Sequence, residues 1–267
     1  MLQYTGLAKS TYYAVLKTLV KKDKYKTLRL AIKRICKENK YRYGYRRVTI
    51  QLKREGFKVN HKVVMRLMKE ENLSCKTKYN KYNSYKDTMG QSRNNIIKRN
   101  FEAQEANKKW ATDVTEFKAG GKKLYLSAVI DMYNSEIISY SIAEKPTLKF
   151  VLEMLKRAII KTKNTNGLIL HSDQGWQYRH AAYQNMLKEN SIVQSMSRKG
   201  NCLDNALIEN FFGILKREMY HGVGFKTIDD LKRELQDYIE YYNHKRIKEK
   251  LQGLSPVEFR LKHHFSA

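Results

Sequence analysis

Three acidic residues beyond the first 100 positions have the types and the spacing that metal-assisted chemistry needs. Asp113 lies in Trp110-Ala-Thr-Asp-Val-Thr-Glu-Phe117, Asp173 follows 60 positions later in His171-Ser-Asp-Gln-Gly-Trp-Gln-Tyr178, and 35 residues separate Asp173 from Glu209. Three carboxylates without local lysine partners repel one another when they approach, and divalent cations remove that cost. Carboxylate oxygens are hard ligands that suit Mg²⁺, with Mn²⁺ as its substitute. The three acids therefore predict a metal site.

Two ions about 3.5–4 Å apart would suit in-line attack at phosphorus, because one activates the attacking hydroxyl and the other stabilises the leaving oxygen. Such a site needs no covalent protein nucleophile. His171 as a general base and Ser172 as the nucleophile of a Ser-His-Asp hydrolase are the alternatives. A histidine beside an aspartate more often has an orienting or structural role, and no nucleophile-elbow glycines surround Ser172. Metal-dependent phosphoryl transfer is the favoured interpretation.

The elements that would position these acids follow from the hydrophobic pattern, which predicts a mixed α/β sheet. We expect Asp113 on the first strand, Asp173 at the exit of the fourth strand and Glu209 on a later helix. If the first and fourth strands are neighbours, the two aspartates project side by side. The predicted strands are 111–117, 123–130, 136–142, 168–170 and 192–195, with a hairpin turn at 119–121 and helices at 148–160 and around 183–187.

The helix that carries Glu209 is predicted over 204–218, with Asp204 as its N-cap. Lys216 lies two turns after Glu209, so both side chains should leave the same side of the helix. Asp131 is interpreted as a surface group at a strand end. The apolar residues of this helix predict a buried stripe formed by Leu207, Phe211, Ile214 and Leu215.

The net charge of the chain indicates that its binding partner is a polyanion. The 267 residues carry a formal net charge of +27, and 27 of the 53 basic residues but only 6 of the 26 acidic ones lie in the first 100 positions. The chain has no apolar run long enough for a membrane span and no signal-peptide pattern, so the preferred polyanion is nucleic acid rather than a membrane surface. Three scattered cysteines, Cys36, Cys75 and Cys202, are typical of a reducing cytoplasm.

The basic amino-terminal part reads as helices of a DNA-binding helix-turn-helix region. We expect a short helix capped by Ser10, a helix over 27–39, a second helix ending before Gly56 and a third capped by Asn60. The alternative is a small helical bundle with a solvated basic face. The candidate DNA contacts are Arg46, Arg47, Lys62 and Arg66.

The remaining segments connect or extend these units. Residues 75–107 read as a basic linker, and 227–246 as a long amphipathic helix that packs on the core or on another protomer. The expected domains are 1–74, a helical DNA-binding region; 75–107, the linker; 108–222, the catalytic core; and 223–267, a helical extension.

The motifs together resemble those of bacterial insertion-sequence transposases related to retroviral integrases. The chain is similar to the second product of the group whose transposase is assembled from two overlapping reading frames, and the abrupt start within a helix-turn-helix agrees with such a product. Ala106, in place of a frequent proline, and Lys248, in place of a frequent histidine, depart from the group's pattern. The motifs are Trp110–Thr115, His171–Gly175, Ser197–Ala206 and Glu209–Lys216, with Tyr43–Arg47, Tyr242–Arg246 and Leu251–Phe259 in support.

This resemblance implies a ribonuclease-H-like core, magnesium dependence, and cleavage with strand transfer at an element's terminal inverted repeats. It implies that Asp113, Asp173 and Glu209 are metal ligands, and that Lys216 contacts DNA near the scissile phosphate. Further DNA-facing residues would be Arg198, Lys199, Asn201 and Asn205; the alternative for these four is an ordinary polar surface loop.

The expected partners are double-stranded DNA, as terminal repeats and as target, and a second copy of the chain or a higher oligomer on DNA. The first-reading-frame product is a further partner, and the bacterial cytoplasm with its nucleoid is the expected location. Two other functions compete with transposition: a non-catalytic DNA-binding regulator of a full-length transposase, and a ribonuclease or structure-selective nuclease on the same core.

Overall fold

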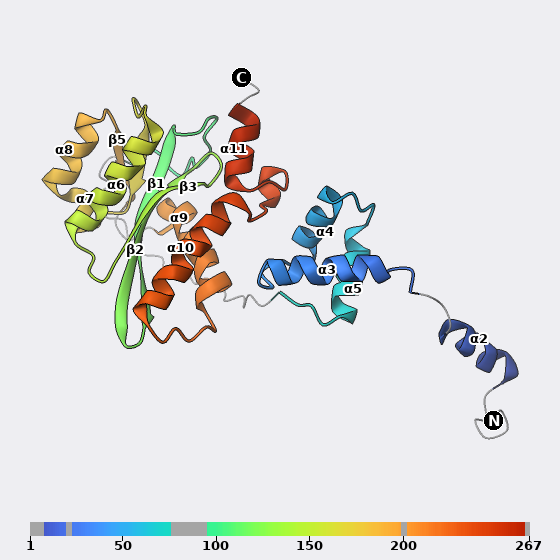
Figure 1. Cartoon of the computed structure of the whole chain (residues 1–267). Coiled ribbons are helices and arrows are strands. Elements are labelled where there is room, and N and C mark those ends of the chain that lie inside the picture. The colour runs from blue at the N-terminus through green and yellow to red at the C-terminus, as the bar shows by residue number, and fades with distance from the viewer. Residues whose placement is uncertain (1–7, 20–22, 76–94, 199–201, 265–267) are drawn as a thin grey trace. The chain divides into compact units, whose positions relative to one another are not determined.

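The computed structural model describes residues 8–19, 23–75, 95–198 and 202–264. The chain divides into two compact units, Met1–Lys76 and Thr77–Ala267 (Figure 1). Each unit has its own buried core, so each is described by itself.

The amino-terminal unit is helical. Its helices are α2 (Lys9–Leu19), α3 (Lys26–Glu38), α4 (Tyr45–Arg54) and α5 (His61–Glu70). Helices α3, α4 and α5 bury one apolar face each, through residues such as Ile32, Leu52 and Leu67. The side chain of Asn60 accepts a hydrogen bond from the Lys62 backbone N–H, which confirms the predicted cap of α5. The predicted Ser10 cap is wrong, because α2 already begins at Lys9.

The carboxy-terminal unit is built on a five-stranded mixed sheet with the order β3-β2-β1-β4-β5. The strands are β1 (Lys109–Ala119), β2 (Lys122–Asp131), β3 (Ile137–Ala143), β4 (Ile169–Ser172) and β5 (Val193–Met196). The first three form an antiparallel meander, and β4 pairs in parallel with both β1 and β5. The predicted fold class is therefore confirmed, including the condition that the first and fourth strands are neighbours.

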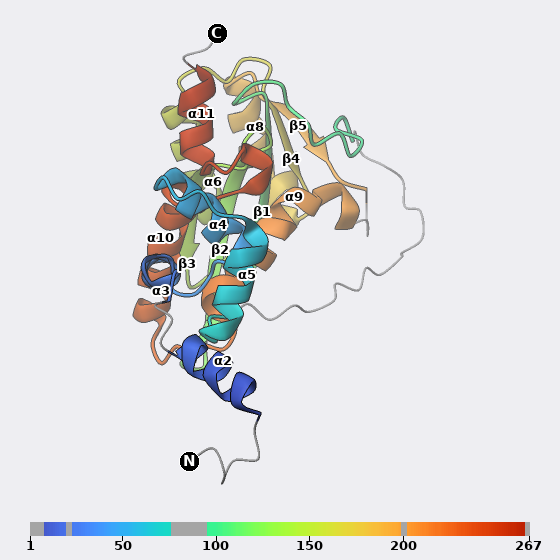
Figure 2. The same cartoon turned by 90° about the vertical axis from the view of Figure 1, so that its right-hand side faces the viewer.

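Two helical layers cover the sheet (Figures 1 and 2). On one face, α6 (Leu148–Thr162), α7 (Trp176–Arg179) and α8 (Ala181–Glu189) enclose a core that contains Trp110. On the other face, α9 (Ala206–Leu215) and α10 (Ile228–His244) enclose a core that contains Phe117. Side chains alternate along β1, so Ala111 and Phe117 face the α9 layer. Asp113 lies an even number of residues from Ala111 and Phe117 along β1, so its side chain also points towards α9.

The helix of Glu209 is shorter than predicted and buries a different stripe. Helix α9 ends at Leu215 and continues as the π-helical turn η2 (Lys216–Tyr220). Leu207 and Ile214 are only half-buried. The helix begins two residues later than expected and lies against both β1 and the carboxy-terminal helices, which rotates its apolar face. Its buried residues are Ile208, Phe211, Phe212 and Leu215.

The carboxy-terminal helix belongs to the core of the same unit. Helix α10 starts after the N-cap Thr227 and buries Leu231, Leu235 and Tyr238 against the sheet. Two short elements follow, η3 (Glu249–Leu251) and α11 (Pro256–His264). Of the two predicted packing partners of this helix, the core of its own unit is the one observed.

Candidate active site

The three candidate acids come from three neighbouring elements. Asp113 lies on β1, Asp173 follows the last residue of β4, and Glu209 lies in the first turn of α9. The parallel pairing of β1 and β4 places Asp113 level with Asp173, and α9, which packs on β1, carries Glu209. The register of the fold thus joins residues that are 96 positions apart in sequence.

The electrostatics of Asp113 indicate that Asp173 and Glu209 both lie near it. Burial raises the pKa of Asp113 to about 7, and the negative charges of Asp173 and Glu209 add to this rise. A hydrogen bond of 2.7 Å from the Val114 backbone N–H to Asp113 Oδ1 and the charge of Lys216 oppose it. The site thus disfavours three ionised acids, which is the condition that a cation relieves.

The donor chemistry fits Mg²⁺ or Mn²⁺, because all three side chains offer hard carboxylate oxygens. The side chains are near one another without being gathered around one point: within the described ranges, no three His, Cys, Asp or Glu side chains already form a group that could hold a metal ion. Asp173 Oδ1 accepts a 2.9 Å hydrogen bond from the Gly175 backbone N–H. A shift of side chains or of α9 would be needed to bring the three acids onto a shared ion.

Lys216 lies beside the acids, at the end of α9. Burial lowers its pKa, against the raising effect of the Glu116 and Asp113 charges. Its ammonium group lies 5.2 Å from the centre of the Phe117 ring, a cation–π contact. Lys216 and Glu209 therefore both interact with Asp113, in agreement with the predicted common side of the helix.

His171 and Ser172 have structural surroundings. His171 is fully buried, its Nδ1 lies 2.9 Å from Ser195 Oγ, and burial lowers its pKa. Ser172 is 1% exposed, and its hydroxyl donates to the Asp173 backbone carbonyl. Neither side chain is open to a substrate, so these positions do not favour the general-base or serine-hydrolase alternatives.

Asp131 is not the surface group that the sequence predicted. It is fully buried, and its carboxylate accepts hydrogen bonds of 2.7 and 2.8 Å from the backbone N–H groups of Asn107 and Tyr133. Burial raises its pKa to about 6, against these two bonds. It lies at the end of β2, where the chain turns back, and ties the approach to β1 onto that turn.

Asp204 is also misassigned as a helix cap. It lies in the 3₁₀ turn η1 (Cys202–Asn205), and the position before α9 is occupied by Asn205, whose side chain makes no capping hydrogen bond. The Asp204 carboxylate is fully buried and binds the guanidinium groups of Arg198 and Arg99. Burial would raise its pKa, but the hydrogen bonds from the two arginines outweigh burial and hold it well below the ordinary value.

The residues predicted to face DNA on the approach to α9 have different environments. Arg198 is bound to Asp204 and keeps 43% of its side chain exposed. Asn205 is 3% exposed, a buried position where an exposed one was predicted. Lys199 and Asn201 lie outside the described residues.

The basic residues predicted to bind DNA in the amino-terminal unit lie on α4 and α5. Arg46 and Lys62 are exposed, and Arg47 is half-buried with its guanidinium 5.6 Å from the centre of the Tyr43 ring. Arg66 is exposed but lies 5.5 Å from the Tyr25 ring centre and 3.6 Å from a Glu70 carboxylate oxygen. Lys62 thus stands on the capped first turn of α5, where the helix dipole adds positive potential.

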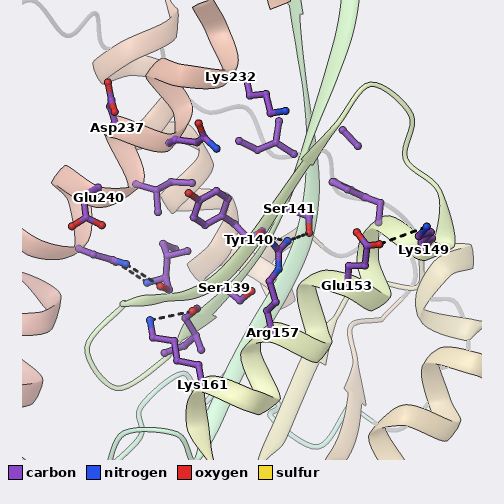
Figure 3. Close-up of a pocket in the computed structure, with 18 of the residues that line it drawn as sticks. Ser139, Tyr140, Ser141, Lys149, Glu153, Arg157, Lys161, Lys232, Asp237 and Glu240 are labelled. Carbon is purple, nitrogen blue, oxygen red and sulfur yellow. Dashed lines mark hydrogen bonds and ion pairs between the residues drawn. The ribbon is translucent and has the colours of Figure 1, made fainter. Parts of the chain in front are cut away.

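A hollow of about 1000 Å³ lies elsewhere in this unit, between the edge strand β3 and helices α6 and α10 (Figure 3). Arg157 and Lys161 donate hydrogen bonds to the backbone carbonyls of Tyr140 and Ile138 along this edge. None of the three candidate acids lines the hollow. These two cationic side chains bind carbonyl groups of the edge strand β3, and such contacts protect an edge strand from pairing with strands of other chains.

Sequence reasoning missed the buried polar residues that support the site. Asp131, Asp204 and the ion pair between Arg246 and Glu218 are all buried, and each has at least one partner more than 20 positions away. The Arg246 guanidinium and the Glu218 carboxylate are 3% and 5% exposed. A usable signal was present in part, since Asp204 lies inside a motif together with Arg198.

The chain matches three family models. An integrase core domain matches residues 103–202, a second integrase core domain model matches 209–263, and an HTH-like domain matches 22–81. The ribonuclease-H-like fold class and the helix-turn-helix region expected from the sequence agree with these matches.

Proteins with similar sequences come from insertion sequence elements. The InsK protein of insertion sequence element IS150 from Escherichia coli K12 is 51% identical over 97% of this chain and 92% of its own length. The transposase of insertion sequence element IS904 from Lactococcus lactis is 37% identical over 85% of this chain and 91% of its own length.

Among solved structures, the HTLV-2 integrase catalytic core domain in complex with magnesium is similar to this chain. The match covers 59% of this chain and 98% of the integrase chain, at 18% identity and a TM-score of 0.46.

In the described part of the chain, no helix is long and apolar enough to cross a membrane.

Proposed function

The chain belongs to the family of insertion-sequence transposases that carry an integrase core domain, and from this premise we propose that Asp113, Asp173 and Glu209 form its catalytic centre. As a member of that family it is a DNA transposase, an enzyme of the polynucleotidyl-transferase type. The observation that carries the assignment is the placement of three acids on the neighbouring elements β1, β4 and α9, near enough that the charges of Asp173 and Glu209 add to the effect of burial on the pKa of Asp113.

The family depends on divalent metal, and in this proposal the three carboxylates hold two Mg²⁺ ions, or Mn²⁺ in their place. When bound, such ions supply an activated hydroxyl and stabilise the leaving oxygen at phosphorus. The protein's own residues supply the ligands and their placement. Asp113 accepts a hydrogen bond from the Val114 backbone N–H within β1, and Asp173 accepts one from the Gly175 backbone N–H after β4, so both carboxylates are oriented by neighbouring backbone groups. Glu209 enters with α9, whose position completes the ligand set.

Basic residues complete the proposed reaction site. Lys216, half-buried beside Asp113, would contact DNA next to the scissile phosphate, and Arg198 with Lys199 and Asn201 would line the approach, whereas the buried Asn205 would not take part. Arg46, Arg47, Lys62 and Arg66 of the amino-terminal unit would bind the terminal inverted repeats. The reaction joins two DNA ends to a target, so the acting form is a dimer or higher oligomer on DNA, with the first-reading-frame product as a further partner and the nucleoid as the place of action. The four domains expected from the sequence remain part of this proposal.

The test is strand transfer on terminal-repeat DNA with Mg²⁺, comparing wild type with Glu209→Gln. The change keeps the shape of the side chain but removes a ligand charge, so cleavage and joining should fall by at least about 100-fold while DNA affinity is retained. The matched control is Glu153→Gln on α6, an exposed acid whose contact is a 3.9 Å ion pair with Lys149. This control should act like wild type.

Three outcomes decide between the functions. Unaltered activity of Glu209→Gln would overturn the catalytic assignment. DNA binding without cut or joined products under any metal condition would favour a non-catalytic regulator of a longer transposase. Cleavage that ignores the terminal repeats would favour a structure-selective nuclease.

A further inference from the structure

The segment 95–99, called here the strap, is fastened to the catalytic unit at two points. At the first point, the Asn95 side-chain amide donates to Asp204 Oδ2 at 2.9 Å, and Arg99 Nε donates to Asp204 Oδ1 at 2.9 Å. The Asp204 carboxylate is fully buried, and Arg198 holds it from the other side through its backbone N–H and its guanidinium. A buried carboxylate with this many charge-assisted bonds has a strongly determined position.

At the second point the strap reaches the strands. The backbone N–H groups of Ile96 and Ile97 lie 3.1 and 3.4 Å from Ser195 Oγ on β5. The same hydroxyl lies 2.9 Å from Nδ1 of the buried His171, on β4. His171 is two residues before Asp173. The Ile97 side chain, 3% exposed, packs into the core beneath α9.

Each of the two points at which the strap is bound lies close in the fold to one of the proposed metal ligands. Asp204 lies two residues before α9, whose first turn carries Glu209, and Ser195 contacts the strand that leads to Asp173. The strap itself is outside the matched domains, because the HTH-like domain ends at residue 81 and the integrase core begins at residue 103. Asp204 also lies between the two integrase-core matches, 103–202 and 209–263.

We propose that Asp204 is a positioning residue through which the strap sets the placement of the Glu209 helix. The inference rests on the proposed catalytic role of Glu209. The strap is the described segment that the chain enters after leaving the amino-terminal unit, so it connects the unit expected to bind terminal repeats with the start of α9. Glu209 lies in the first turn of α9, so the position of this helix determines the position of the Glu209 carboxylate relative to Asp113 and Asp173. In this proposal, a change in the strap would reach the Glu209 helix through Asp204.

The test removes one fastening and leaves the rest of the fold in place. Arg99→Gln in the full chain loses one guanidinium, while Arg198 still neutralises Asp204, so folding should be retained. The matched control is Arg233→Gln, an arginine 73% exposed on α10 that pairs with Asp230. Amide hydrogen exchange without DNA is read over 95–99, η1 and α9. Single-turnover strand transfer and DNA affinity are measured separately.

In Arg99→Gln, exchange should quicken in the strap and also in η1 and the first turn of α9. The single-turnover rate should fall roughly tenfold while the Kd for DNA stays within about twofold, because the loss is one of ligand placement. Asp204→Asn, which keeps the shape and removes the charge, should lose more. Arg233→Gln should match wild type in both measurements.

Faster exchange confined to 95–99, or an unchanged rate, would overturn the proposal. A rate loss matched by an equal loss of DNA affinity would also overturn it, because Arg99 would then be a DNA contact. The exchange measurement needs neither DNA nor activity. If wild type itself joins no DNA ends, the proposed function fails, and the exchange data still decide whether the strap controls α9.

Discussion

Ala111 of β1 lies opposite His171 of β4 in the parallel register of the sheet. Asp113, within β1, and Asp173, directly after β4, each follow two residues later, so the two aspartates lie at the same level of adjacent strands. This register brings two like charges together. Burial is the main cause of the raised pKa of Asp113, and the charge of Asp173 adds to it.

The raised pKa of Asp113 predicts a pH-dependent penalty on stability. The pKa is about 7 in the folded protein and 3.8 ordinarily, so between these values the folded state binds a proton that the unfolded state has released. Stability should therefore fall as the pH rises through this window, and the whole penalty is present above pH 7. Asp113→Asn carries no charge and should melt at a higher temperature than wild type at pH 8 in metal-free buffer, with no gain near pH 4. Each kcal/mol relieved corresponds to roughly 2–4 °C. Equal melting temperatures at pH 8 would contradict this prediction.

Metal addition should reverse the same penalty. Millimolar Mg²⁺ or Mn²⁺ should raise the melting temperature of the wild-type catalytic unit, because an ion that binds only the folded state stabilises it by about 2.7 kcal/mol at 100 times its Kd. Asp173→Asn should lose most of this rise. Asp229→Asn, at the exposed start of α10, is the control and should keep it. A rise of the same size in Asp173→Asn would place the ion elsewhere.

Lys62 should contribute to DNA binding through phosphate contact. It is exposed on the first turn of α5, so Lys62→Ala should weaken binding to all DNA sequences alike and reduce the slope of log K against log salt by about 1. Fluorescence anisotropy at several salt concentrations measures both effects. Lys149→Ala, 86% exposed on α6, removes the same charge from the other unit and should leave the slope unchanged. A sequence-dependent loss would instead indicate base reading by Lys62.

The ion pair between Arg246 and Glu218 should be a strong determinant of stability. Both groups are buried, Arg246 Nη2 lies 2.7 Å from Glu218 Oε1, and the Tyr238 hydroxyl donates to the same carboxylate. Arg246→Ala leaves a buried unpaired charge and should cost about 3–5 kcal/mol in urea unfolding of the catalytic unit. Arg233→Ala, which breaks an exposed ion pair, should cost less than about 1 kcal/mol. Similar costs for the two variants would show that the buried pair has relaxed or hydrated.

Much of the architecture could be predicted because it depends on local patterns. The β-forming runs of β1 and β2, the two glycines at the hairpin turn and the Asn60 cap are readable from a few neighbouring residues. Gly120 and Gly121 indeed have φ of 54° and 75°, a conformation that costs glycine little. The identity of the three acids also followed from types and spacing, and their roles as ligands remain a proposal.

Other features could not be predicted, because they depend on partners more than 20 positions away. Asp131 and Asp204 are ordinary acidic residues in sequence, and only the fold buries the first against Asn107 and the second against Arg99. The same holds for the buried face of α9, which the neighbouring strand and helices select among several apolar residues.

The amino-acid sequence by itself determined the strands and helices, the basic amino-terminal part and the three acids, because hydrophobic period, charge and residue type are local properties. Tertiary structure alone decided that β1 and β4 lie side by side, that Asp204 is bound by a segment from before the core, and how near Glu209 comes to the aspartates. Distances between elements arise from packing and long-range register, which no local pattern specifies.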